Sequence, residues 1–143
     1  MKKVLFAVAV ALAAVSLRAD ADGYIMLSVF SPGELPAPSS SIYGGRLSLI
    51  YGECHELYGL DLGVAGYMRE RLSGAQLNAI WNGVGTDMAG CQLGLVNTAE
   101  GDASGLQLGL VNVADHLYGC QIGLVNVVMD RDWTVWPFIN IGW

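Results

Sequence analysis

One octapeptide recurs along this chain and constrains its fold more than any other feature. Three copies are nearly identical: 90–97 (GCQLGLVN), 105–112 (GLQLGLVN) and 119–126 (GCQIGLVN). Weaker copies hold the same phase, so that units begin near 24, 44, 59, 74, 90, 105, 119 and 133. A single long interruption, the Pro- and Ser-rich loop 32–42, separates the first two units. Repetition at this short period predicts one β-repeat domain, residues 22–143.

Each unit alternates in polarity with the two-residue period of a β-strand. In one copy Leu106 and Leu108 point to one side, whereas Gln107 points to the other. The leucine side is flanked by aromatic residues, and the opposite side is polar and rich in glycine. The polar residues that share this second face are Arg46, Asp61, Gln76, Asn78, Gln92, Gln107 and Gln121. We interpret this row as structural, or as the lining of a lumen.

Arg46 and Asp61 hold the same phase on neighbouring units, so we expect them to pair. On a half-exposed sheet face such a pair contributes only ~0–1 kcal/mol.

Two all-β architectures fit a one-strand repeat. The first is an eight-unit antiparallel meander, closed or nearly closed into a barrel. The second is a parallel β-solenoid with coils of about 15 residues. A straight eight-residue strand covers about 26 Å, and the seven residues left in each unit reach at most about 25 Å. A solenoid therefore requires the motif to bend at its middle glycine (Gly94, Gly109 or Gly123), and the length argument favours the meander.

The barrel has further support, and some features oppose it. Strands of about 10 residues, an apolar face with aromatic ends and a terminal Trp143 are typical of outer-membrane barrels. Against it stand Pro137, which lacks a ladder donor, uniformly short turns, and a polar face too rich in glycine to fill a small lumen. In a soluble sheet or solenoid the leucines would instead form a dry core, with glycine and glutamine outside and Asn97, Asn112 and Asn126 at turn corners.

The first 21 residues have the pattern of a secretory signal peptide. Lys2 and Lys3 precede an unbroken apolar run, 4–15, and Ala19-Asp-Ala21 fits a cleavage site. Removal of 1–21 leaves four of seven basic and twelve of thirteen acidic residues, hence a net charge of −8. This balance argues against nucleic acid as a partner and against electrostatic docking on anionic lipid.

Residues with the chemistry of catalysis or metal binding are few and scattered. His55 lies in Glu53-Cys-His-Glu56 and His116 follows Asp115, and we interpret both stretches as solvated turns. Cys54 has no evident partner there. The repeat places Cys91 and Cys120 two strands apart, roughly 10 Å, too far for a disulfide. We therefore expect no catalytic, cofactor or metal site and identify no small-molecule substrate.

The repeated G-x-Q-[LI]-G-L-V-N unit resembles a family of surface-repeat proteins of Gram-negative bacteria. Further likeness lies in the early strand that ends at Ser31-Pro32, in units such as 47–52 and 57–63, and in the closing segment 137–143. The resemblance implies an outer-membrane or cell-surface location and no enzymatic activity. We accordingly expect a non-enzymatic structural or interaction protein that contacts outer-membrane lipid or a surface partner. The alternative is an exported periplasmic binding module that presents its Gln/Gly face or its acidic turns.

Overall fold

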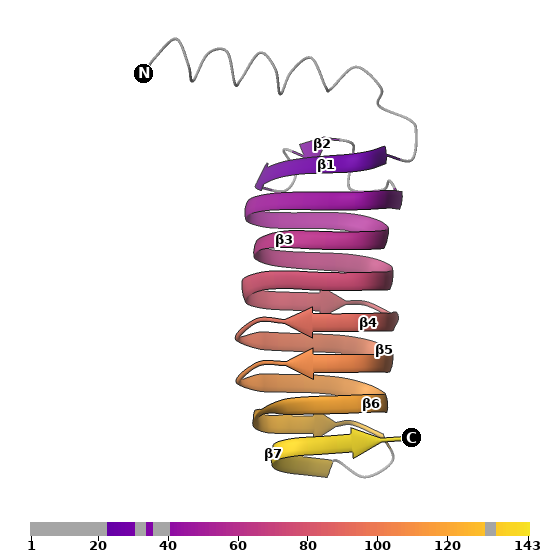
Figure 1. Cartoon of the computed structure of the whole chain (residues 1–143), viewed down its shortest axis with the longest axis vertical. Coiled ribbons are helices and arrows are strands. Elements are labelled where there is room, and N and C mark those ends of the chain that lie inside the picture. Colours follow the sequence, from indigo (N-terminus) through magenta and orange to yellow (C-terminus); the bar gives the residue numbers. More distant parts are fainter. Residues whose placement is uncertain (1–22, 31–33, 36–40, 131–133) are drawn as a thin grey trace.

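The chain forms a parallel β-solenoid, a stack of flattened coils that lengthens along one axis (Figure 1). The computed structural model describes residues 23–30, 34–35, 41–130 and 134–143, so the expected signal peptide and most of the loop 32–42 lie outside the described residues. The strands are β1 (Gly23–Phe30), β2 (Glu34–Leu35), β3 (Ser41–Val84), β4 (Asp87–Leu93), β5 (Val96–Leu108), β6 (Val111–Val128) and β7 (Thr134–Gly142). They form one sheet in the order β2-β1-β3-β4-β5-β6-β7.

The prediction of an all-β repeat is confirmed, but the preferred antiparallel meander is wrong. β1, β3, β4, β5 and β6 pair in parallel, with Gly90 opposite Gly105 and Gly105 opposite Gly119. The repeat units therefore stack as successive coils of about 15 residues, which is the alternative that the length argument disfavoured. Antiparallel pairing is confined to the ends, where β2 pairs with β1 and β7 pairs with β6.

The length argument failed because the motif bends in its middle. β4 ends at Leu93 and β5 begins at Val96, and β5 ends at Leu108 and β6 begins at Val111. The chain turns at 94–95 and 109–110, so neither half of a coil has to span the full 26 Å. At Gly109 a Cβ would overlap the carbonyl oxygen of Gly94 in the preceding coil. Glycine thus permits both the bend and the close stacking of one bend on the next.

Each coil has a long face and a short face, joined by two corners. In the coil formed by β5, residues 96–99 lie on the short face and 103–108 on the long face. The corner at 94–95 and 109–110 is apolar, and the corner at 100–102 is charged. Between the two faces lies a core that is apolar near the charged corner. Its members are Met26, Ile42, Cys54, Leu57, Met68, Leu72, Val84, Met88, Ala99, Ala103, Ala114 and Leu117.

The rest of the interior is polar, and this reverses the arrangement expected for a soluble solenoid. Gln76, Gln92, Gln107 and Gln121 are completely buried, whereas the side chains that alternate with them include the exposed Leu93, Leu106, Leu108 and Ile122. The predicted alternation is therefore confirmed. The prediction of a leucine core with glutamine outside is wrong, because the amides hydrogen-bond to one another in the interior.

The last strand ends the stack. β7 runs antiparallel to β6 and follows its outline, with Ile139 opposite Ile122 and Asn140 opposite Gln121. Phe138 has a φ of 68°, which is unusual for a residue other than glycine, and it lies where the pairing of the two strands is irregular. The reversed direction distinguishes β7 from the coils above it.

Candidate functional site

The predicted polar row becomes a ladder of glutamine amides along the solenoid axis. Gln121 donates through Nε2 to Oε1 of Gln107 (2.8 Å), and Gln107 donates in the same way to Gln92 (2.8 Å). Gln92 donates to Gln76 (3.0 Å), and Asn140 of β7 donates to Gln121 (3.0 Å). Stacking of identical residues in register lets each glutamine amide hydrogen-bond to its neighbour, so these buried amides satisfy one another.

A second ladder, of asparagines, lies beside the first and runs in the opposite direction. Asn82 donates to Asn97 (2.7 Å), Asn97 to Asn112 (2.8 Å) and Asn112 to Asn126 (2.8 Å). Each donor lies in the earlier coil, whereas each glutamine donor lies in the later one. Asn97, Asn112 and Asn126 were expected at turn corners outside the core; the structure buries all three. The signal for the ladder was available in the sequence, because Asn97, Asn112 and Asn126 recur in phase with the glutamines.

Arg46 and Asp61 replace the amide pair in the first coils of this polar interior. Nε of Arg46 donates to Oδ1 of Asp61, and Nη2 of Arg46 donates to Oδ2. Each of these donor–acceptor distances is 2.7 Å. Both side chains are 0% exposed, so the expected half-exposed pair is fully buried. The asparagine column is glycine here, at Gly52 and Gly66, and a Cβ at Gly66 would overlap both charged groups. The two glycines therefore make room for the guanidinium.

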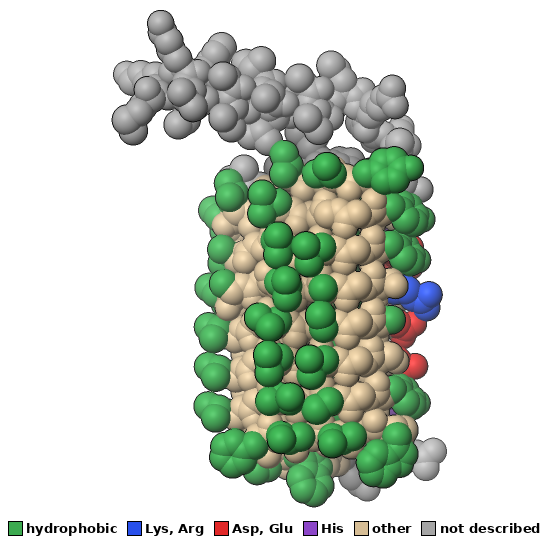
Figure 2. All heavy atoms as spheres, viewed as in Figure 1, with side chains coloured by type: hydrophobic (Ala, Val, Ile, Leu, Met, Phe, Trp, Pro, Cys, Tyr) green, Lys and Arg blue, Asp and Glu red, His purple; other side chains and the backbone are tan. Residues whose placement is uncertain are grey.

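The predicted leucine side forms an exposed apolar surface, which we call the leucine ridge. It includes part of the long face and continues around the apolar corner. Its members, each more than a third exposed, are Leu47, Leu49, Ile50, Leu62, Ile80, Leu93, Leu95, Leu108, Leu110, Ile122, Leu124 and Val125. Figure 2 shows hydrophobic side chains in rows over one face and along the left edge of the stack, whereas the right edge carries hydrophobic and charged side chains together. Shallow depressions separate some of these leucines.

The backbone along the crest of the ridge is hydrogen-bonded within the protein. Leu95 N donates to Ala79 O (3.3 Å), Leu110 N to Leu95 O (2.9 Å) and Val125 N to Leu110 O (3.0 Å). These bonds connect each corner to the corner of the preceding coil. The crest therefore exposes aliphatic side chains whose amide N–H groups are already bonded.

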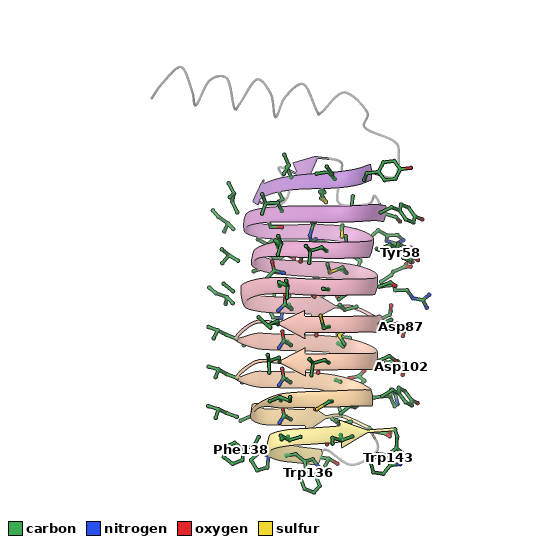
Figure 3. The ribbon with its side chains drawn as sticks, in the orientation of Figure 1. Tyr58, Asp87, Asp102, Trp136, Phe138 and Trp143 are labelled. Atoms are coloured by element: carbon green, nitrogen blue, oxygen red, sulfur yellow. The ribbon has the colours of Figure 1, made fainter. Side chains whose placement is uncertain are left out.

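The corner opposite the ridge carries charge. Arg71 bonds Asp87 (3.0 Å) and Arg69 bonds Glu53. Hydrogen bonding to Asp87 raises the pKa of Arg71 above its ordinary value. Figure 3 shows Asp87 and Asp102 on the same edge of the stack as Tyr58, whereas Phe138 leaves the opposite edge. The solenoid is thus amphipathic across its width, with charge at one corner and leucine at the other.

The histidines and cysteines lie apart from one another. His55 faces Glu70 (3.5 Å), and His116 faces Asp102 (3.5 Å), all on the charged corner. Cys54 was expected in a turn, but it faces the core, where Nη1 of Arg46 contacts its sulfur (3.4 Å). Leu106 pairs with both Cys91 and Cys120 in the register, so one coil separates these cysteines as predicted. Within the described ranges, no three His, Cys, Asp or Glu side chains group as metal ligands.

Comparison with known protein families, curated proteins and solved structures finds no match in any of the three. In the part of the chain that the structure describes, no helix has the length and apolar character needed to cross a membrane.

Proposed function

We propose that this chain is an exported, non-enzymatic structural or interaction protein of the outer membrane or cell surface. The observation that carries the proposal is the leucine ridge on a body whose interior holds amides and a charge pair. The pattern of residues 1–21 supports export, and the repeat unit supports kinship with surface-repeat proteins.

The ridge is costly for a protein that remains surrounded by water. Full burial of one leucine is worth about 1.5–3 kcal/mol, and this chain leaves a continuous series of them exposed while it buries glutamine. Contiguous exposed apolar surface of this kind is typical of interaction sites with proteins or membranes. A lasting apolar contact at the cell envelope removes this cost.

Cell fractionation tests the proposal. We expect the protein in the outer-membrane fraction, retained after washes with high salt and released by a mild detergent. Surface location is checked by protease digestion of intact cells against cells with a permeabilised outer membrane. Recovery of the whole pool in the osmotic-shock fluid, without detergent, would contradict the proposal.

A second candidate is a periplasmic binding module that uses the acidic turns. The charged corner favours it, because Asp87, Asp102 and Asp130 are each about half exposed. A binding module that uses its Gln/Gly face is not supported, because the glutamines of that face are buried. The double change Asp87→Asn and Asp102→Asn distinguishes the candidates: it abolishes capture of a binding partner by the module and leaves membrane fractionation unchanged.

A further inference from the structure

We infer that the leucine ridge inserts into the hydrocarbon of a lipid surface, with the solenoid axis parallel to the membrane plane and the charged corner in water. This inference rests on the proposed function and specifies what the ridge contacts and how the molecule is oriented.

The side chains of the ridge fit hydrocarbon better than a protein partner. Protein interfaces concentrate Tyr, Trp and Arg at their centre and form hydrogen bonds there. Here the centre is aliphatic, and none of the ridge residues carries a charge or a hydrogen-bonding side chain. Aromatic side chains lie beside it instead: Trp81, on the short face, stacks on Tyr67 and donates to Thr98. Aliphatic centres with flanking Trp and Tyr are typical of protein in contact with a bilayer.

Three amide N–H groups at the crest of the ridge meet the strictest requirement of a lipid contact. Hydrocarbon offers no partner to an N–H or C=O group, so each unsatisfied group costs several kilocalories per mole there. The crest amides of Leu95, Leu110 and Val125 are bonded to the preceding coil. The crest can therefore leave water without losing any of these bonds.

The convex shape of the ridge leaves little area for contact with the ridge of a second copy of this chain. The ridge is convex, because it follows the long face, turns through the corner at 94–95 and 109–110, and reaches the short face. Two convex ridges meet along a line and leave both flanks in water. Fluid acyl chains cover the crest and both flanks together.

The direction of the ridge sets the orientation of the molecule. Leu47, Leu93 and Ile122 belong to coils near the start, middle and end of the stack, and all are exposed. A surface that follows the axis makes full contact only when the axis lies in the membrane plane, as in interfacial helices that bury an apolar face about 5–10 Å deep.

The charge distribution selects the kind of lipid. The charged corner carries more acid than base, with Arg69 and Arg71 already paired to Glu53 and Asp87. This corner gains nothing from anionic headgroups, and the residues that the structure describes include no lysine to bind them. Binding is therefore apolar in origin, favours zwitterionic lipid and is insensitive to salt.

Flotation of the exported protein with phosphatidylcholine vesicles tests the inference. The double variant Leu93→Glu and Leu108→Glu should lower the partition coefficient by about tenfold or more, since both leucines would enter hydrocarbon. The matched control is Ala89→Glu and Ser104→Glu, which places the same charges on the same coils and face but away from the ridge. It should bind within about twofold of the parent, and raising salt from about 50 to 500 mM should change neither result.

Other outcomes overturn the inference in recognisable ways. Circular dichroism verifies that each variant is folded, and Leu110→Glu, at the exposed corner, provides an independent ridge variant. Unchanged binding by the folded ridge variants would overturn the inference. So would a dimer in solution that Leu110→Glu converts to monomer, which would assign the ridge to a second copy. If the protein is found in the envelope fraction but does not bind vesicles, this inference alone is refuted. If it binds vesicles but is absent from the envelope fraction, only the proposed function is refuted.

Discussion

Arg46 and Asp61 form a doubly hydrogen-bonded ion pair with both side chains 0% exposed, in line with the glutamine ladder. Asp61 also accepts a bond from Asn78 Nδ2 (2.6 Å), and Arg46 donates to the Tyr67 carbonyl (3.3 Å). Burying two charges is expensive, and the cost is offset only when both are paired and hydrogen-bonded. The pair is therefore sensitive to any change that removes one partner.

Removal of one charge should destabilise the protein strongly. Asp61→Asn leaves the Arg46 guanidinium buried without a counter-charge, and we expect unfolding free energy to fall by about 3–5 kcal/mol. Urea denaturation followed by circular dichroism measures the change.

Replacement of both charges provides the control for this prediction. Arg46→Gln with Asp61→Gln extends the amide ladder by two coils and should recover more than half of the loss, although Gly52 and Gly66 leave space beside it. If the losses measured for Arg46→Gln alone and Asp61→Gln alone summed to the loss in the double variant, the pairing would have no energetic role.

The reversed polarity of the interior makes adjacent positions respond in opposite ways. Gln107→Leu removes the partner of both Gln92 and Gln121 and should cost about 2–4 kcal/mol, although it makes the interior more apolar. Leu108→Gln, one residue on, lies on the exposed ridge and should change stability by less than about 0.5 kcal/mol. Thermal and urea unfolding of the two variants side by side gives the comparison. A leucine core with external glutamine would give the opposite order.

A backbone contact between coils makes one glycine column intolerant of any side chain. Gly105 has a φ of +131°, and a Cβ there would overlap the Gly90 carbonyl oxygen. We expect Gly105→Ala to lower stability by about 2 kcal/mol or more. The matched change, Gly45→Ala, places its Cβ 3.9 Å from the Leu60 oxygen and should be tolerated. Equal thermal midpoints for the two variants would contradict the close stacking of coils.

The raised pKa values of two tyrosines predict that the folded protein loses stability at alkaline pH. Burial, followed by the Glu100 and Glu53 carboxylates, raises the pKa of Tyr67 above its ordinary value of 10.0, and the Glu56 carboxylate raises the pKa of Tyr58. The fold thus prefers the neutral phenols. Their contribution is complete below pH 10, the unfolded value, and is lost as pH rises through the higher folded pKa values.

Phenolate absorbance and urea unfolding from about pH 9 to about pH 11 measure this effect. Tyr67→Phe should reduce the loss of stability over that range. If the tyrosines of the unfolded chain also ionised only above their ordinary pKa, the folded structure would not be the cause of the raised pKa values.

The amino-acid sequence was sufficient to predict strands and the two-residue alternation. It also predicted the pairing of Arg46 with Asp61 and the separation of Cys91 from Cys120. All of these follow from phase along the chain, which is a local property. The prediction that Cys54 lies in a solvated turn was wrong. It relied on the polar neighbours Glu53 and His55, whereas the inward direction of the Cys54 side chain depends on the stacking of the next coil.

Tertiary structure decided the direction of pairing and which side of the strand lies inside. Alternation assigns residues to two sides of a strand, but the pattern is the same in parallel and antiparallel sheets. The choice depends on the bends at Gly94 and Gly109, where backbones of successive coils approach too closely for a side chain. Once the coils stack in register, glutamine lies on glutamine and asparagine on asparagine, and each amide satisfies the next. That satisfaction, available only between coils, is why the polar residues occupy the interior and the leucines remain outside.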